Sequence, residues 1–247
     1  LRRSVYGTVS GGIAGTPAAA RVVEDAGYRG PLAVVPQFGV DAERFRPDPG
    51  ARRRARERMG IEDAGFLVGF GGRLVPEKGV DLLVRAVADL PDVALVVAGE
   101  GPERGRLVSL ARELGAAERV HFRGQVPSTE MPVWLSALDA LALPSLATRS
   151  WAEQFGRILV EAMACGVPVV ASRSGEIPYV VGDEGLLVPE GDVAALRAAL
   201  ERLAADSDLR GRLACSGRER VLRRFTQARI AADTLDFYGR LLAGRAS

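Results

Sequence analysis

The sequence predicts an α/β protein whose core is a Rossmann-like, doubly wound parallel sheet. From Phe66 onward, apolar segments of four to seven residues alternate with segments of helical periodicity, and glycine-containing loops follow most of the apolar segments. Strands that are apolar throughout and alternate with helices are typical of parallel sheets covered on both faces. Ligands of such sheets bind beyond the carboxyl ends of the strands, so the loops there are the first place to look for function.

The predicted elements follow one another regularly along the chain. The strands are FLVGFGG (66–72), VALVVAG (93–99), RVHF (119–122), ALALP (140–144), VPVVAS (167–172) and GLLVPEG (185–191). The helices include residues 78–89 and 102–114, and the chain has helical periodicity from Asp192 onward. The loops that follow the strands are therefore GGRLVPEKG, GEGPERG, RGQVPST and PSLATRSWAEQFG.

The first forty residues precede this alternation. Residues 3–10 (RSVYGTVS) are predicted to form a short strand, and residues 16–28 an amphipathic helix that ends near Gly27. The start of the chain does not have the pattern of a secretory signal peptide. We expect it to begin abruptly within a strand, as a truncated protein would.

Composition narrows the functional classes. A chain of 247 residues forms one large domain or two smaller ones, and 47% hydrophobic residues supply an ample core. The net charge is only +2 and no long basic block occurs, so no nucleic-acid partner is predicted. Cys165 and Cys215 form no CxxC motif, which indicates a reducing, cytoplasmic location and no metal site. No apolar run reaches the length of about 18 residues that spans a membrane.

Several common enzyme classes fit poorly. There is no GxxxxGK[ST] motif for an ATPase, and no GxSxG elbow accompanies the single histidine, His121, as a hydrolase would require. One histidine also excludes HExxH and multi-histidine metal sites. Residues 99–105 (GEGPERG) resemble a dinucleotide fingerprint, but the last glycine comes one residue late and no acidic residue ends the next strand. A nicotinamide dehydrogenase is therefore a poor alternative.

The most informative stretch is EQFGRILVEAMACGVPVVAS, residues 153–172. Glu153 and Glu161 lie at the two ends of a glycine-containing turn and an apolar helix, which Gly166 and Pro168 end. If all the intervening residues were helical, the two carboxylates would lie about 12 Å apart along the axis. That exceeds the roughly 5–9.5 Å between the paired carboxyls of glycosidases. The spacing suits the two ends of one extended ligand better.

This stretch resembles the donor-site signature of retaining GT-B glycosyltransferases of family four, and the resemblance extends from about Pro36 to Gly239. It implies the C-terminal half of a GT-B fold, with a UDP- or GDP-sugar as substrate and no cofactor. In the family, the glutamate at the position of Glu161 holds the ribose hydroxyls, and the one at Glu153 lies near the transferred sugar. Tyr179 departs from the pattern, because the family often has a second glutamate there.

The resemblance also assigns roles to other residues. Arg73 and Lys78 would neutralise the diphosphate without a metal and form the catalytic set with Glu153. The amides of Phe155 and Gly156 should begin the helix and cradle a phosphate. Further donor contacts are predicted at Gly72, Gly99, Arg123, Gly124 and Val126, the last three around the nucleobase, and weaker ones at Gly175 and Glu176. Trp151 either lines the sugar pocket or packs under its loop.

The predicted organisation has three parts. Residues 1–35 would be the remnant of an N-terminal acceptor domain, 36–225 the donor-binding domain, and 226–247 a helix returning towards the N-terminal domain. The missing half would bind the acceptor and would make any peripheral membrane contact. One helical face is expected to pack on that half or to cause self-association: Ile230, Thr234, Leu235, Tyr238, Leu241 and Leu242.

The predicted function is retaining transfer of a sugar from a nucleotide sugar, with this chain inactive alone. Two alternatives stay open at the sequence level. One is a non-catalytic module that binds nucleotide sugars, and the other is a GT-B epimerase of sugar nucleotides.

Overall fold

A computed structural model describes residues 6, 8–61 and 65–244. The chain divides into two compact units: residues 42–221 form one, and residues 1–41 with 222–247 form the other. We call them the large unit and the small unit and describe each by itself. The predicted roles of 1–35, 36–225 and 226–247 remain predictions.

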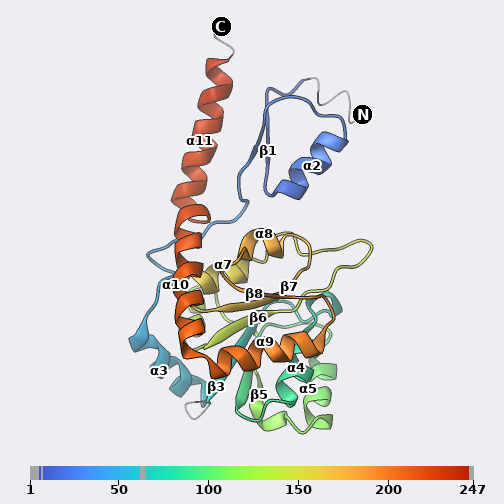
Figure 1. Ribbon diagram of the computed structural model, residues 1–247, viewed down its shortest axis with the longest axis vertical. Coiled ribbons are helices and arrows are strands. Elements are labelled where there is room, and N and C mark those ends of the chain that lie inside the picture. The colour runs from blue at the N-terminus through green and yellow to red at the C-terminus, as the bar shows by residue number, and fades with distance from the viewer. Residues whose placement is uncertain (1–5, 7, 62–64, 245–247) are drawn as a thin grey trace. The chain divides into compact units, whose positions relative to one another are not determined.

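The large unit contains a six-stranded parallel sheet with the order β5-β4-β3-β6-β7-β8 (Figure 1). The strands are β3 (Phe66–Gly71), β4 (Val93–Ala98), β5 (Val120–Phe122), β6 (Ala140–Leu143), β7 (Val169–Ser172) and β8 (Leu186–Val188). β3 pairs with β4 from Phe66↔Val93 to Gly71↔Ala98. On its other side β3 pairs with β6, so the order reverses between β3 and β6. The predicted doubly wound parallel sheet is confirmed, and its switch point lies between these two strands.

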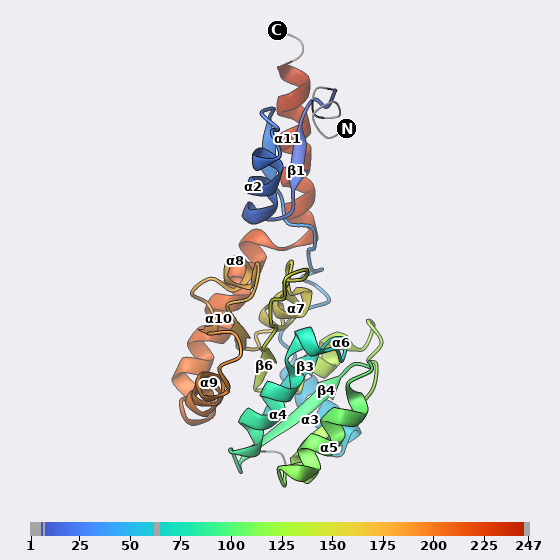
Figure 2. The ribbon, with the colours of Figure 1, turned by 90° about the vertical axis from the view of Figure 1, so that its right-hand side faces the viewer.

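Helices cover the sheet in two layers. In one layer, α4 (Val80–Ala88) contacts both α5 (Arg104–Glu113) and α9 (Val193–Ala205); in the other, α7 (Arg157–Ala164) contacts both α6 (Met131–Ser136) and α8 (Ile177–Val181) (Figure 2). Further helical segments are η1 (Pro76–Lys78), η2 (Ala117–Arg119) and α10 (Ser207–Arg224). Leu67, Phe70 and Leu95 are fully buried between the layers, as expected for strands covered on both faces.

The sequence analysis did not predict helix α3 (Pro49–Met59). Asp48 caps its first turn by accepting from Ala51 N, and Gly60 ends it in the left-handed conformation. The segment is rich in arginine, so it has almost no apolar stripe to reveal it.

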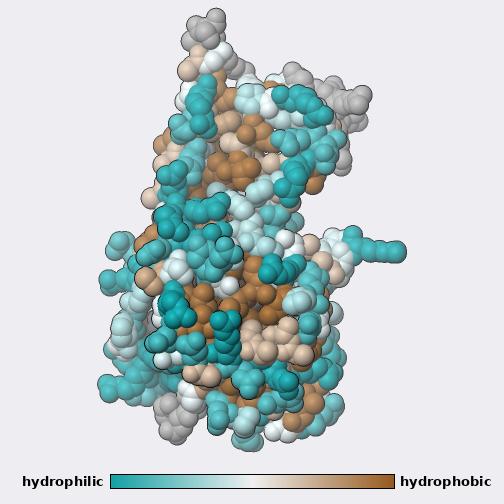
Figure 3. All heavy atoms as spheres, in the orientation of Figure 1, coloured by the Kyte–Doolittle hydropathy of each residue, from teal (hydrophilic) through white to brown (hydrophobic). Residues whose placement is uncertain are grey.

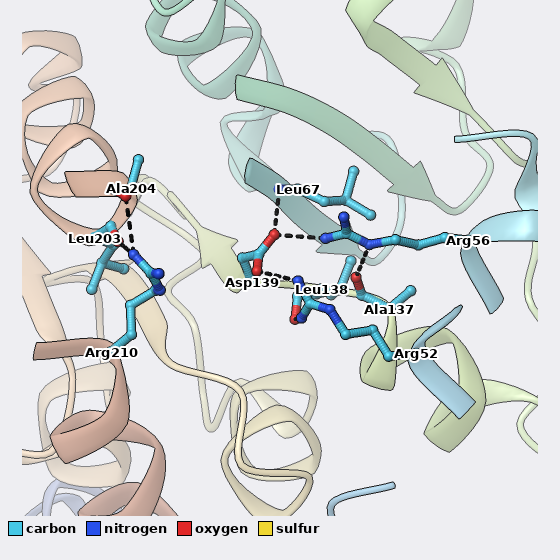
Figure 4. A network of polar contacts seen from close by, with 9 residues as sticks. All are labelled: Arg52, Arg56, Leu67, Ala137, Leu138, Asp139, Leu203, Ala204 and Arg210. Atoms are coloured by element: carbon cyan, nitrogen blue, oxygen red, sulfur yellow. Dashed lines mark hydrogen bonds and ion pairs between the residues drawn. The ribbon is translucent and has the colours of Figure 1, made fainter. Parts of the chain in front are cut away.

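Polar contacts anchor α3 to the sheet (Figure 4). The carboxylate of Asp139, just before β6, accepts from Leu67 N at 2.7 Å and from Arg56 at 2.6 Å, and it also binds Arg52. Arg56 Nε donates to Ala137 O at 2.9 Å. These contacts join α3 to the amino ends of β3 and β6, at the opposite edge from the predicted site.

The small unit begins with a pair of short parallel strands, β1 (Gly12–Ala14) and β2 (Leu32–Val34), connected through α2 (Pro17–Asp25). The predicted strand at 3–10 is wrong for its described part, because Tyr6 and residues 8–10 are not in a strand; its other residues lie outside the described ones. The strand begins at Gly12, where Gly12 N donates to Pro31 O. The predicted helix at 16–28 is present, capped by Thr16.

The small unit is completed by α11 (Gln227–Ala243), and Thr226 before it pairs with Val40. Hydrophobic residues gather between α11 and the β1–α2 segment (Figure 3). Phe237 is the buried residue of the helix, at 5% exposure. Three residues of the predicted face, Leu235, Tyr238 and Leu242, are 69%, 52% and 68% exposed, so within this chain they have no covering partner surface. At 3.6 residues per turn they lie on a different side of the helix from Phe237 and Leu241.

Within residues 6, 8–61 and 65–244, no helix could serve as a membrane span.

Candidate functional site

A cavity of about 430 Å³ lies at the carboxyl ends of β3 and β6, where the strand order reverses. Its walls come from the ends of these strands, the loop after β5 and the beginning of α7. The cavity is lined by six of the predicted site residues: Gly72, Lys78, Val126, Glu153, Gly156 and Glu161. The switch point of a doubly wound sheet is where its ligands are expected, so this is the candidate site.

Glu153 lies just before the start of α7 and is bound by two side chains. Its Oε2 lies 2.5 Å from Lys78 Nζ and 3.0 Å from Ser145 Oγ, and the residue is only 8% exposed. Ser172 in turn donates to the backbone oxygen of Ser145. The predicted sugar-side glutamate and the predicted phosphate-side lysine thus form one ion pair. Ser145 was missed by the sequence analysis, since it is eight residues away and gives no local signal.

The loop 173–176 supports the backbone of Glu153. Glu176 N donates to Glu153 O at 2.8 Å. Gly175 has φ +52°, and a Cβ there would lie 2.2 Å from the same oxygen. Gly175 is therefore required for a close backbone approach. Gly175 and Glu176 therefore contribute to the candidate site by supporting the backbone of Glu153.

Trp151 covers the lysine. Lys78 Nζ lies 5.0 Å from the centre of the Trp151 ring, within the range of a cation–π interaction. Thr148 shapes the loop, because its Oγ1 accepts from Trp151 N at 3.1 Å and its own N donates to Trp151 O at 2.7 Å. Of the two interpretations of Trp151, the structure shows the ring packed on Lys78 at the edge of the site.

The stretch between the two glutamates is helical only in part. α7 begins at Arg157, and Gly156 precedes it with φ +74°, in the left-handed region. The spacing of about 12 Å assumed a continuous helix and therefore does not apply. Phe155 is buried, and Gly156 lines the cavity. The prediction that Phe155 and Gly156 begin the helix is wrong: Gly156 is the left-handed residue before the helix, so the first turn of α7 begins at Arg157.

Glu161 lines the cavity from within α7. It is 5% exposed, and its Oε1 accepts from Arg157 Nε at 2.7 Å. Burial raises the pKa of this carboxyl, while the guanidinium groups of Arg157 and Arg44 act in the opposite direction. The sequence analysis missed Arg157, although a position four residues before a glutamate on a helix is a recognisable pairing pattern.

Glycines in the loops after β3, β4 and β5 lie beside the cavity. Gly99 has φ +149°, and a Cβ there would lie 1.8 Å from Gly72 O. Gly99 N donates to Gly124 O at 2.7 Å, and Gly72 N donates to Ala98 O at 2.9 Å. The loops after β3, β4 and β5 are thereby stacked closely together, which explains these glycines by backbone packing.

Two predicted residues lie elsewhere. Arg73 is exposed and is not among the residues that line the cavity. Arg123 donates to Met59 O and lines a neighbouring cavity of about 190 Å³ with Trp134 and Glu130. Val126 lines both cavities, so this second space adjoins the predicted nucleobase end.

Neither Cys165 nor His121 lines the cavity. Burial raises the pKa of the Cys165 thiol to about 12, so it stays protonated. His121 lies on β5 outside the cavity, and burial lowers its pKa. Within the described ranges, no three His, Cys, Asp or Glu side chains gather as a metal-binding cluster would.

Comparison with known proteins decides the family. Residues 51–220 match the family model described as glycosyl transferases group 1. The chain belongs to this family. The GDP-mannose-dependent alpha-(1-6)-phosphatidylinositol monomannoside mannosyltransferase of Mycolicibacterium smegmatis is 41% identical over 192 residues, which are 74% of this chain and 50% of that protein. The chain spans about half the length of the curated relatives it matches.

Solved structures agree with this assignment. Anabaena Alr3699/HepE in complex with UDP and glucose matches with a TM-score of 0.82 and 26% identity, over 98% of this chain and 66% of that one. The C-terminal domain of a glycosyl transferase group 1 family protein from Francisella tularensis matches with a TM-score of 0.67 and 28% identity, over 76% of this chain and 100% of that one. The fold is that of GT-B glycosyltransferases, as predicted.

Proposed function

We propose that this chain supplies the donor-binding half of a retaining glycosyltransferase that uses a nucleotide sugar. The observation that carries the proposal is the cavity at the sheet's switch point. It is lined by Glu161 at one position and by the Lys78–Glu153 ion pair at another. A carboxylate can accept hydrogen bonds from sugar hydroxyls, and a cation can bind phosphate. One cavity that contains both groups therefore matches the parts of a sugar nucleotide.

Each part of the donor has a partner in this proposal. Glu161 accepts hydrogen bonds from the ribose hydroxyls. Lys78 and the first amides of α7 bind the diphosphate, with Arg73 joining from the exposed loop after β3. These groups stabilise the negative charge that develops as the diphosphate leaves. Glu153 lies beside the transferred sugar, and the acceptor attacks the face from which the diphosphate departs, so that the anomeric configuration is retained.

The relatives support the donor class. One is named GDP-mannose-dependent, and Alr3699/HepE has been solved with UDP and with UDP-glucose. A UDP- or GDP-sugar is therefore the proposed substrate, used without a metal or cofactor. The proposed arrangement assigns 1–35 to the end of an acceptor domain, 36–225 to the donor domain and 226–247 to a returning helix, in a cytoplasmic enzyme. The acceptor binds mainly to the other half.

A thermal-shift panel tests the proposal. UDP, GDP, UDP-glucose and GDP-mannose are each added to the chain. Either the two uridine compounds or the two guanosine compounds should raise the melting temperature of the chain. Glu161→Ala should reduce the affinity by about 2 kcal/mol, the cost of removing a hydrogen-bonding carboxylate. A matched control is Glu113→Ala, an exposed glutamate at the end of α5. Equal binding by Glu161→Ala and the wild type would refute the ribose assignment.

A further inference from the structure

Arg157 and Glu161 form an unequal pair within the cavity. Arg157 is the first residue of α7, and both side chains line the cavity one helical turn apart. The Arg157 side chain is 60% exposed, whereas that of Glu161 is 7% exposed. A charged carboxylate so deeply buried is costly unless a cation or hydrogen-bond donor compensates for the lost water. Arg157 Nε, at 2.7 Å from Oε1, supplies both.

The surroundings of Glu161 leave this task mainly to Arg157. Arg44 also acts on Glu161, and it donates to the backbone oxygen of Ser128 on the loop after β5. Cys165, one turn further along the chain, is a protonated thiol. α6, α8, β6 and β7 also pack against α7, and among the described residues they contribute no further charged group acting on Glu161.

We propose that Arg157 is a positioning residue for Glu161. It binds Oε1 and holds the carboxylate in one orientation, which leaves Oε2 to accept from a ligand in the cavity. Among the described residues, Arg157 makes the only hydrogen bond to this side chain. The inference rests on the proposed ribose role of Glu161: two vicinal hydroxyls need an ionised carboxylate with a free oxygen, and Arg157 maintains both conditions.

The test compares Arg157→Gln, Arg157→Lys and the wild type by calorimetric titration with UDP and with GDP from pH 5.5 to 8.5. Without Arg157, nothing beside Glu161 on α7 opposes the effect of burial, so the carboxyl stays protonated to higher pH. Arg157→Gln should therefore bind about tenfold more weakly at pH 5.5, with the loss shrinking as the pH rises. Titration of the ligand phosphate cancels, because the same nucleotide is used with both proteins. Lysine at this position should restore most of the affinity.

The matched control is Arg229→Gln. Arg229 pairs with Asp233 at the same spacing on α11, at 2.6 Å, and its side chain is 56% exposed. This variant should bind as the wild type does at every pH. A loss in Arg157→Gln that is constant with pH would overturn the proposal, since it would mean that Arg157 contacts the nucleotide directly. Wild-type affinity at all pH values would also overturn it.

Two further measurements separate this inference from the proposed function. Glu161→Gln tests the ribose role alone: if it binds normally, the ribose assignment fails irrespective of Arg157. Carbon-detected NMR follows the titration of the Glu161 carboxyl without any nucleotide, and the signal is identified by its loss in Glu161→Gln. The carboxyl should titrate at higher pH in Arg157→Gln than in the wild type. Unchanged titration would overturn the positioning role even if no nucleotide bound.

Discussion

At the scale of single residues, the site is organised by two buried glutamates with different partners. Glu153 is held by Lys78 and Ser145, and Glu161 by Arg157. Each carboxylate therefore meets a cation before any ligand is bound. A diphosphate that reaches Lys78 competes with Glu153 for the ammonium group, so the proposed donor site changes its own contacts as it fills.

Lys78 should discriminate between nucleotides and nucleosides. Lys78→Met is expected to weaken UDP or GDP by roughly 10- to 100-fold, the value of one hydrogen bond to a charged group, and to leave uridine or guanosine unaffected. Calorimetric titration measures both. Arg112→Met, which removes an exposed arginine from α5, controls for the change in net charge. The same loss for nucleoside and nucleotide would contradict a phosphate role, and loss of binding in EDTA would contradict metal independence.

Glu161 should reduce stability at neutral pH. Because burial raises the pKa of its carboxyl, the folded state binds a proton more tightly than the unfolded state. The stability that this proton contributes is present at low pH and is lost as the pH rises through the folded pKa. Glu161→Gln, which is neutral throughout, should therefore raise Tm at pH 8 but have little effect near pH 4. A pH series of thermal melts measures this, and an equal shift at both ends would disprove it.

At the scale of secondary-structure elements, α3 is attached to the sheet through charged side chains. Its contacts converge on Asp139, whose side chain is 13% exposed and joins α3 to the starts of β3 and β6 (Figure 4). Removing one member of such a buried cluster leaves the others unsatisfied, which costs more than the pair contributes while intact.

Asp139→Ala should thus destabilise the large unit by about 3 kcal/mol. The substitution leaves Leu67 N–H and the Arg56 guanidinium without this acceptor. Urea unfolding followed by circular dichroism measures the change. Asp236→Ala is the control, because Asp236 and Arg240 form an exposed ion pair that should contribute less than about 1 kcal/mol. Similar losses of unfolding free energy in the two variants would show that the cluster around Asp139 stabilises the protein no more than an exposed ion pair does.

At the scale of the whole molecule, exposed apolar side chains are concentrated in the small unit. Leu235 and Leu242 on α11 are 69% and 68% exposed, and Val22 on α2 is 67% exposed. Such surface favours association with another protein surface. The large unit differs, since helices of the same unit cover both faces of its sheet.

We therefore expect the isolated chain to self-associate through α11. Light scattering should show a concentration-dependent increase in mass, and Leu235→Ser with Leu242→Ser should reduce it. In hydrogen exchange, β3, β4, β6 and β7 should remain protected in both proteins, because the core of the large unit is unchanged. Leu114→Ser is the control, as Leu114 is 38% exposed at the end of α5. A wild-type chain that stays monomeric at all concentrations would rule out this role for α11.

The sequence by itself predicted the strands of the large unit, most of its helices and the loops that line the candidate site. The sheet and the donor motif could be read from the sequence because both are local patterns. The parallel sheet is indicated by alternating apolar segments, and the donor motif by residues Glu153 to Ser172. The same dependence on local patterns explains the missed helix, because the arginine-rich α3 has no apolar stripe.

Only the tertiary structure decided which side chains meet. Lys78 comes from the loop after β3, whereas Ser145 and Glu153 come from the loop after β6. The crossing order of the strands brings these two loops together, and the spacing of the residues in the sequence does not reveal that Lys78 binds Glu153. The removal of Glu161 from water likewise results from the packing of α7 against β6 and β7. Burial sets the strength of electrostatic interactions, and burial is a property of the folded chain.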